Sequence, residues 1–477
     1  MRIVIVGAGP AGLAMGMRLK RAGHTDFTIV ERSRGVGGTW HDNRYPGAGC
    51  DVPSHLYCFS FAPKPDWQHK FARQPEIEAY FQRCVEREGL ASHLQLGTEV
   101  HGAEFVDGSW RVRTSSGELT ADVLVSGTGQ LNRPHIPAFP GLDTFAGTTF
   151  HSARWNHDYD LRGKRVVVIG NGASAAQFVP EIAQHVGKLT LLQRTPAYVF
   201  PRKDRAYFGV EKWLFKYVPG WRRFYRSWIY WTLESRFTAL FQNSVMGQLV
   251  KWMMLRHLRK QVADPKLRAT LTPNYPVGCK RIVISDDWYP ALQRDNVALV
   301  TSLLERITAD AVITADGATH PADAIIFATG FESTSFLAPM QIVGKTGTTL
   351  AAAWQGGAEA HRGVLVSGFP NLFLLYGPNT NLGHSSILFM IECQVRYVLG
   401  CLDQLARRGA RWVDVKREAM AHYNDELQQS LTRMTWAADC HNWYKTDDGK
   451  ITNNWSGHTT QYWWRTRKPN LDELEIS

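Results

Sequence analysis

Three glycines near the start of the chain have the spacing of a dinucleotide-binding turn. Gly7, Gly9 and Gly12 match the pattern G-x-G-x-x-G, after the apolar run 1–6 and before the helical stretch 13–23. In such a turn the first glycine permits the sharp bend, the second lets a pyrophosphate approach the backbone, and the third allows the helix to pack closely on the strand. Because the helix N-terminus then faces the phosphates, the pattern predicts a dinucleotide site.

A carboxylate follows at the place where a ribose would lie. Glu31 ends the next predicted strand, 27–31, and stands 19 residues after Gly12. An acid at this place accepts hydrogen bonds from free ribose hydroxyls. The N-terminal site therefore suits FAD, and the full combination of strand, glycines, helix and acid is more specific than the glycines alone.

Residues 165–175 repeat this pattern with a change of charge. Gly170 and Gly172 supply the first two glycines, and Ala175 takes the third place, which the G-x-G-x-x-G/A form permits. The strand that follows ends at Arg194 where the first site has an acid. An arginine there favours a 2′-phosphate over a free hydroxyl, and so predicts NADPH as the cofactor. A solvated loop arginine is the plainer alternative.

Two such sites in one chain predict hydride transfer from NADPH to FAD. The seven cysteines are scattered and contain no C-x-x-C pair. This favours reduced thiols in a cytosol, and it argues against a disulfide-reductase centre or a zinc site, so no metal is expected. Without paired cysteines the reduced flavin has to pass its electrons elsewhere, and oxygen is the obvious acceptor.

Length and composition are those of an ordinary soluble globular protein. The chain has 477 residues, of which 44% are hydrophobic and 20% charged, and should divide into two or three domains. The first predicted strand begins at residue 2, which argues against a secretory signal. No apolar run reaches the roughly 18 residues that a spanning helix needs. A cytoplasmic location is therefore expected.

The net charge of +11 is concentrated in one region. Residues 194–281 hold 18 Lys and Arg against 4 Asp and Glu. Such a surface can bind nucleic acid, a phosphorylated cofactor or a membrane, but no nucleic-acid module is visible, so no nucleic-acid partner is expected. Within this region, 207–260 is predicted to be a helical insertion. Its helical stripe of aromatic residues is more typical of a packed core or interface than of a membrane-touching surface that admits apolar substrates. The stripe consists of Trp221, Phe224, Tyr225 and Trp228.

These patterns predict an α/β fold with two Rossmann-like dinucleotide-binding domains. Residues 1–145 form the first part of the FAD domain, and 146–330 form the NADPH domain with its helical insertion. Residues 331–477 return to the FAD domain, and their Trp-rich end, 440–464, is predicted to form a loop that covers the substrate. A Pro-rich stretch, 133–147, links the domains.

A third motif resembles the fingerprint of a known family. The segment from Phe145 to Trp155 fits F-x-G-x-x-x-H-x-x-x-W, which is similar to the signature of type I Baeyer–Villiger monooxygenases. The related flavin-containing monooxygenases share its Phe, Gly and His but usually lack the Trp. Asn156 departs mildly from the family pattern, which continues with Pro or Asp. Further matches are GGTW (37–40), YPGAGCDVPS (45–54), QRTP (193–196), CKR (279–281) and NWY (442–444).

The resemblance implies a function and a set of site residues. NADPH reduces FAD, oxygen gives a peroxyflavin, and its anion attacks a ketone to yield an ester or lactone. Arg281 resembles the family's active-site arginine, and Asp51 the carboxylate that positions it; ordinary surface charges are the alternative. His151 resembles a residue that couples domain movement to catalysis, and a proton-transfer role is not favoured. The further cofactor-binding residues implied are Gly38, Thr39, Trp40, Asp51 and Ser174, together with Arg194, Thr195 and Lys280 for the phosphate of NADPH.

Two other functions stay open. Many ketone-oxidising relatives have Arg where this chain has Gly49, and that change is expected to open room near Asp51. An enzyme that oxidises the nitrogen or sulfur of an amine or sulfide is therefore the first alternative. A non-catalytic redox sensor is the second, although it would not need Arg194, Lys280 and Arg281. The substrate is expected to be a bulky apolar ketone, and the sequence does not predict the oligomeric state.

Overall fold

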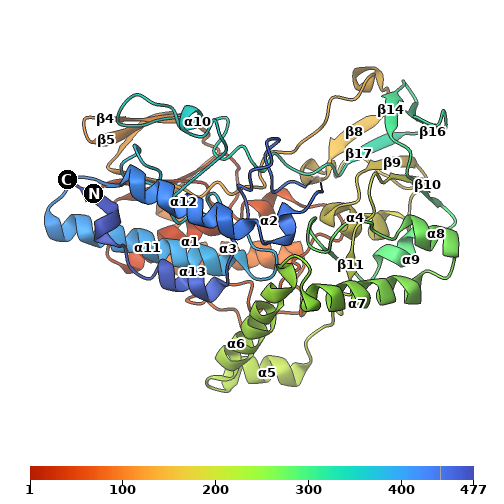
Figure 1. Ribbon diagram of the computed structural model, residues 1–477, viewed down its shortest axis with the longest axis horizontal. Coiled ribbons are helices and arrows are strands. Elements are labelled where there is room, and N and C mark those ends of the chain that lie inside the picture. Colours follow the sequence, from red (N-terminus) through yellow and green to blue (C-terminus); the bar gives the residue numbers. More distant parts are fainter. Residues whose placement is uncertain (441) are drawn as a thin grey trace.

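The computed structural model describes residues 1–440 and 442–477 and consists of two lobes, each built on a five-stranded parallel sheet (Figure 1). The first sheet has the order β19-β7-β1-β2-β3. Its strands are β1 (Ile3–Val6), β2 (Phe27–Glu31), β3 (Leu94–Leu96), β7 (Val123–Ser126) and β19 (Leu372–Leu374). All four residues of β1 are buried, as expected for a strand covered on both faces. Helices α1 (Pro10–Arg21), α3 (Gln74–Glu88) and α11 (Ile387–Arg408) cover this sheet.

The second sheet has the order β13-β10-β9-β17-β8. Its strands are β8 (Thr148–His151), β9 (Arg165–Ile169), β10 (Lys188–Leu192), β13 (Val297–Val300) and β17 (Ala324–Phe327). Helices α4 (Ala173–Ile182) and α9 (Trp288–Leu292) pack against each other beside it, within one hydrophobic cluster. The predicted α/β fold with two Rossmann-like sheets is thus present, and each glycine turn connects the first strand of its pattern to a helix.

Smaller elements complete both lobes. The mixed sheet β18-β4-β5-β6 contains β4 (Val100–Val106), β5 (Ser109–Thr114), β6 (Gly117–Ala121) and β18 (Gln341–Val343). Short strand groups are β11 (Val199–Phe200) with β12 (Val283–Ile284), β14 (Leu304–Ile307) with β15 (Ala311–Thr314) and β16 (Thr319–Pro321), and β20 (Val413–Val415) with β21 (Leu474–Ile476). The remaining α-helices outside segment 207–260 are α2 (Thr39–Asp42), α8 (Pro265–Thr270), α10 (Leu350–Ala353), α12 (Arg417–Leu431) and α13 (Thr459–Arg465).

Segment 207–260 is helical, as predicted, but its aromatic stripe does not lie in the core. It contains α5 (Gly209–Tyr217), α6 (Trp221–Glu234) and α7 (Val245–Gln261), and α5 and α6 protrude at the bottom of Figure 1. Tyr225 packs on Phe215, with ring centroids 5.0 Å apart. In contrast, Phe224 is 62% exposed and Trp228 55% exposed. Of the two predicted alternatives, core or interface, packing in the core is therefore wrong for most of the stripe, because the opposite face of α6 meets the protein; an interface stays a prediction.

No helix in the described part of the chain is long and apolar enough to cross a membrane.

Candidate active site

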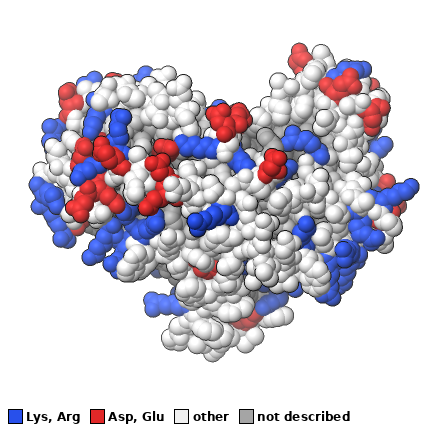
Figure 2. All heavy atoms as spheres, viewed as in Figure 1, with Lys and Arg blue, Asp and Glu red and all other residues white. Residues whose placement is uncertain are grey.

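A cavity of about 1110 Å³ is lined by residues from both parallel sheets. Gly7 and Gly9 of the first glycine turn line it, as do Gly170 and Gly172 of the second. In Figure 2 the molecule is notched between its two lobes. Most of the predicted site residues meet in this one cavity. Those that line it are Gly7, Gly9, Glu31, Gly38, Thr39, Trp40, Asp51, Gly170, Gly172, Ser174, Arg194, Thr195, Lys280 and Arg281.

The first turn has the geometry of a phosphate-binding loop. Gly7 adopts φ 101°, which favours glycine. A Cβ on Gly12 would lie 1.8 Å from the carbonyl oxygen of Gly7, so the third glycine serves helix–strand packing and does not line the cavity. Gly9 is the N-cap of α1 and provides no side-chain cap. The first N–H groups of the helix are therefore available to an anion in the cavity. Gly38 meets the same turn, since a Cβ there would lie 2.8 Å from the Cα of Gly9.

The carboxylate of Glu31 is held by the backbone. One oxygen accepts a hydrogen bond from the N–H of Ala8 at 2.7 Å, and the other accepts from the N–H of Ser33 at 2.8 Å. The side chain is only 8% exposed, yet it lines the cavity. A carboxylate has acceptor capacity beyond two bonds, so Glu31 can still accept from ribose hydroxyls.

The second turn closely repeats the first. Gly170 adopts φ 104°, and Gly172 caps α4 with no side-chain hydrogen bond. A Cβ on Gly172 would meet no atom within 4 Å, because this position opens to the cavity. Ala175 is fully buried in the third position. A pyrophosphate can therefore approach this turn as it can the first.

Two cations lie where the second strand of this pattern ends. Arg194 and Lys280 line both the main cavity and a smaller one of about 430 Å³, which Asp439 also lines. Burial lowers the pKa of Lys280, and the nearby charge of Arg194 lowers it further. Neither cation forms an ion pair with a carboxylate among the described residues. Because each raises the cost of charge on the other, the pair favours binding of a dianion such as a 2′-phosphate.

Arg281 and Asp51 form an ion pair at the cavity wall. The Nη2 of Arg281 donates to Oδ2 of Asp51 at 3.1 Å, and Nε2 of Gln177 on α4 donates to the other oxygen at 3.5 Å. The arginine side chain is 45% exposed, toward a cavity that both residues line. Burial opposes the guanidinium charge, but the carboxylate of Asp51 outweighs it and raises the pKa of Arg281. The guanidinium is thus a permanent cation facing the cavity.

The space beside Gly49 is filled by an arginine that sequence reasoning missed. A Cβ at Gly49 would lie 3.0 Å from Nη2 of Arg202, and that nitrogen donates to the carbonyl of Cys50 at 3.0 Å. The expectation that Gly49 leaves open room near Asp51 is therefore corrected. Arg202 was visible only as one of many basic residues in its segment, and nothing in its spacing connects it to Gly49.

His151 lies outside the cavity wall. It ends strand β8 and is buried, with its Nδ1 accepting a hydrogen bond from the N–H of Ala153 at 3.1 Å. Burial lowers the pKa of His151 to about 4, so the ring is neutral near pH 7. Its ring meets that of Phe331, with centroids 5.7 Å apart, and Phe331 does line the cavity. This placement fits a residue that acts through its neighbours.

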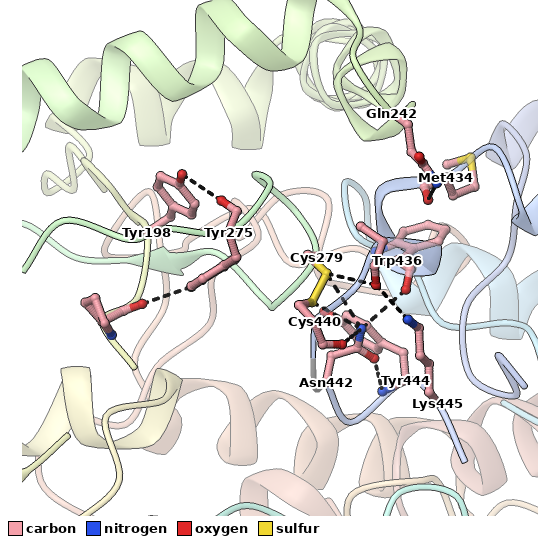
Figure 3. Close-up of a disulfide and its surroundings, with 12 residues drawn as sticks. Tyr198, Gln242, Tyr275, Cys279, Met434, Trp436, Cys440, Asn442, Tyr444 and Lys445 are labelled. Atoms are coloured by element: carbon pink, nitrogen blue, oxygen red, sulfur yellow. Dashed lines mark hydrogen bonds between the residues drawn. A yellow bond between two sulfur atoms is a disulfide. The ribbon is translucent and has the colours of Figure 1, made fainter. Parts of the chain in front are cut away.

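The C-terminal segment reaches the cavity and is tied to the Lys280–Arg281 segment by a disulfide (Figure 3). Cys279 and Cys440 form this bond, so the prediction that all seven thiols are reduced is wrong for these two. Asn442 and Trp443 line the cavity. The Oγ of Ser333 donates to the carbonyl of Trp443 at 2.8 Å. Residue 441 of the predicted 440–464 loop lies outside the described residues.

Comparison with known proteins identifies the family. Residues 1–343 match the family described as Flavin-binding monooxygenase-like. A Baeyer-Villiger monooxygenase of Streptomyces coelicolor is 44% identical over 480 residues, which cover 100% of this chain and 92% of that protein. The chain belongs to the flavin-binding monooxygenase-like family, among its Baeyer–Villiger monooxygenases. The family membership that the sequence motifs implied is thereby confirmed.

Other relatives of this monooxygenase agree. A Baeyer-Villiger monooxygenase of Pseudomonas aeruginosa is 42% identical, covering 98% of this chain and 89% of that protein. A structure of oxidized steroid monooxygenase bound to NADP superposes with a TM-score of 0.88 at 29% identity, covering 100% of this chain and 99% of that one. For the OTEMO complex with FAD and NADP, the TM-score is 0.89 at 26% identity, with the same coverage. The predicted fold class is confirmed by these structures.

Proposed function

We propose that this monooxygenase uses FAD, NADPH and O2 to insert one oxygen atom into an apolar ketone, giving an ester or lactone. The proposal rests on the ion pair of Arg281 and Asp51. Both residues line the cavity that the two glycine turns also line. The two relatives named Baeyer-Villiger monooxygenase, at 44% and 42% identity, support the ketone as substrate class.

The residues at the two turns fit the two cofactors. Gly7, Gly9, Glu31 and the segment 38–40 would hold FAD, since the uncapped N-terminus of α1 and an acid both face the cavity. Gly170, Gly172, Ser174, Thr195 and the cations Arg194 and Lys280 would hold NADPH. Bound there, the cofactors supply a hydride and a route for its electrons to oxygen.

Arg281 stabilises negative charge that develops on oxygen in the cavity. Asp51 fixes the direction of the guanidinium, and Gln177 on α4 fixes Asp51, so the cation is in place before the reaction begins. A preorganised donor of this kind contributes more in a dry site than in water. Lysine could not replace it, because a point ammonium lacks the planar fork that a carboxylate can orient.

His151 is a positioning residue in this proposal. It is neutral near pH 7 and lies behind the cavity wall, where its ring meets that of Phe331. Since it ends the edge strand β8, directly after the linker 133–147, it is placed to transmit movement between the two lobes. Proton transfer to substrate is not assigned to it.

The domain boundaries follow the strand pairing. Residues 1–145 and 331–477 would form the FAD domain, and 146–330 the NADPH domain, which is supported by the pairing of β18 with β4 and of β19 with β7. The end of the chain covers the substrate, since Asn442 and Trp443 line the cavity. Dependence on NADPH, a cofactor of the cell interior, supports a cytoplasmic location.

The test measures ester or lactone formed per NADPH consumed by the FAD-loaded enzyme. A panel of bulky cyclic ketones is compared with tertiary amines and thioethers of similar size. Ketone-dependent NADPH consumption with product in near-equal amount supports the proposal. Oxidation of the amines or thioethers alone would replace it with heteroatom oxidation, and NADPH consumption unaffected by any of these compounds would overturn it.

A further inference from the structure

The surface of the helical insertion carries an unusual number of exposed aromatic side chains. We call the set Trp213, Tyr217, Trp221, Phe224, Trp228 and Trp231 the aromatic patch; all six are exposed, with Trp231 at 60%. Of the eleven exposed Trp, Tyr and Phe side chains in the described residues, nine lie between 208 and 252. Soluble proteins rarely expose contiguous apolar surface of this kind without a partner.

The patch is a second apolar face, and it does not result from poor packing. On α6, Trp221, Phe224, Trp228 and Trp231 recur at helical spacing, while Ile229 and Leu233 of the other face are buried against Leu56. On α5, Trp213 and Tyr217 are exposed, whereas Phe215 is buried. Each helix therefore meets the protein with one face and presents aromatic rings to the outside with the other.

Helix α7 also exposes apolar side chains. Leu249 and Trp252 are exposed and lie three residues apart, so they share a helix face. All three helices follow the lower edge of the molecule in Figure 1, and the protruding lobe is largely white in Figure 2, with Lys and Arg side chains beside it. The exposed rings thus lie on a surface with few charged side chains, and Lys and Arg lie beside it.

The helical insertion has a strongly positive net charge. Residues 207–261 contain ten Lys and Arg but only two acids, Glu211 and Glu234. Glu211 pairs with Arg205 at 2.7 Å, and Glu234 is buried and accepts from Thr459 at 2.7 Å. Neither acid offsets the exposed cations. Among the described residues, Lys216, Arg223, Arg256, Arg259 and Lys260 are exposed and form no ion pair.

Cations and rings are interleaved within the surface. The Nζ of Lys216 lies 5.0 Å from the ring centroid of Tyr217, and the guanidinium of Arg256 lies 5.4 Å from that of Trp252. Trp and Tyr side chains prefer the interface between bilayer and water, because their rings are largely apolar and carry one polar group. Lys and Arg beside them are attracted to anionic headgroups, and the long side chains keep their charges in the headgroup region.

Helix α6 is hydrogen-bonded to the body of the enzyme. The Nη1 of Arg226 on α6 donates to the carbonyls of His55 at 2.8 Å and Cys58 at 3.0 Å. These carbonyls belong to the segment that follows Asp51, and Tyr57 within it lines the cavity. Helix α6, which carries four residues of the patch, is therefore bonded to a segment that also reaches the active-site cavity.

We propose that the aromatic patch binds the surface of an anionic lipid bilayer, with its rings at the level of the headgroups and no segment crossing the membrane. A second copy of the chain is the competing partner for an apolar surface. Symmetric pairing through the patch would place two strongly basic segments against each other, and like charges at an interface oppose association. An anionic membrane instead satisfies both the rings and the cations.

The test is co-sedimentation of the FAD-loaded enzyme with vesicles of phosphatidylcholine alone or mixed with phosphatidylglycerol. Binding should be at least about tenfold tighter to the anionic vesicles and should weaken at high salt. Phe224→Ser/Trp228→Ser/Trp231→Ser and Lys216→Glu/Arg223→Glu should each lower it about tenfold or more. Matched controls are Ile136→Ser, an exposed apolar residue elsewhere, and Lys164→Glu/Lys188→Glu, which makes the same change in net charge.

A second measurement needs no variant. Lipids brominated near the headgroup should quench tryptophan fluorescence of the unmodified enzyme in anionic vesicles, because Trp213, Trp228 and Trp231 are exposed. Equal sedimentation with and without vesicles, or equal loss of binding in the control variants, would overturn the proposal. So would a dimer, found by sedimentation equilibrium, that the triple substitution dissociates in the absence of lipid, since the partner would then be a second copy.

Discussion

The two glycine turns share one backbone geometry and differ in the charge placed next to it. Gly7 and Gly170 have φ of 101° and 104°, and a Cβ on either would press on the backbone of the neighbouring strand's end, at Gly127 and Ala328. Both helices that follow have a glycine N-cap without a side-chain hydrogen bond. The turn is thus a device for presenting free N–H groups, and it does not by itself select a cofactor.

Selection lies at the strand ends. Glu31 is buried and held by two backbone N–H groups, so it is ready to accept from hydroxyls. Arg194 is exposed to the cavity and lies close enough to Lys280 for their charges to repel. A bound dianion would offset this repulsion. The comparison teaches that the specificity of each lobe comes from one charge and its neighbours, while the shared turn provides the phosphate contact.

The largest effect is expected from the third position of the turns, where they differ in packing. Gly12→Ala places a Cβ 1.8 Å from the carbonyl oxygen of Gly7, and backbone atoms cannot yield as a side chain would. We expect a loss of at least about 3 kcal/mol of stability and protein that purifies without flavin, measured by thermal unfolding and by absorbance of the flavin.

The matched change in the second turn is Ala175→Gly. It should cost only about 0.5–1 kcal/mol and leave the flavin content unchanged, because it removes one methyl group from a helix. Equal effects of the two substitutions would show that the turns do not differ in packing at this position.

Arg281, which lines the cavity that both turns also line, should give the next largest effect. Arg281→Ala removes one preorganised charge, worth about 2.7–4 kcal/mol, so ester formation should fall by two to three decades. NADPH consumption should continue and yield hydrogen peroxide, because Lys280 and the glycine turns are intact. The measurement is ester formed per NADPH consumed. Arg281→Lys should recover little, and a wild-type ester yield from Arg281→Ala would remove the charge-stabilising role.

Substitution of His151, which lies outside both turns, tests the predicted pH dependence of stability. Its pKa is lowered from 6.5 to about 4 by burial, so the folded state binds fewer protons than the unfolded state between these values. Stability should therefore fall as pH decreases from about 6.5 to 4, and His151→Gln should reduce this loss by up to about 3 kcal/mol. Denaturant unfolding at pH 4.5 and 7 provides the measurement.

In contrast to stability, catalysis by His151→Gln should show the same pH dependence as wild type near neutral pH. Between pH 6 and 8 the ratio of kcat/KM for wild type and His151→Gln should stay constant, because the ring is already neutral. If the pH profile of kcat/KM changed near neutral pH in wild type but not in His151→Gln, His151 would have an acid–base role.

Arg194→Ala should have a smaller effect on catalysis than Arg281→Ala, and it tests the charge difference between the two sites directly. The KM for NADPH should rise at least about tenfold, or about 1.4 kcal/mol, while the use of NADH changes little. Arg162→Ala, an exposed arginine elsewhere in the same lobe, is the control and should change neither. Equal losses with both cofactors would mean that Arg194 does not contact the 2′-phosphate.

Much of the molecule could be predicted from local pattern. The two glycine turns, the opposite charges at their strand ends and the resemblance to Baeyer–Villiger monooxygenases depend on residues close together in the sequence. Such spacing dictates backbone turns and places groups at strand ends, which is why Glu31 and Arg194 were found. Arg281 was implied only by the family resemblance, and all three residues line one cavity. Their roles in binding and catalysis stay predictions.

The tertiary structure decided what depends on distant partners. A helical stripe shows that one face is apolar, but whether that face meets protein or solvent depends on the packing of another element, so the exposure of Trp228 could not be predicted. Cys279 and Cys440 are 161 residues apart and are joined only because the end of the chain folds over the cavity. Arg202 beside Gly49 has the same origin, since a contact between separate loops leaves no periodic signal in the sequence.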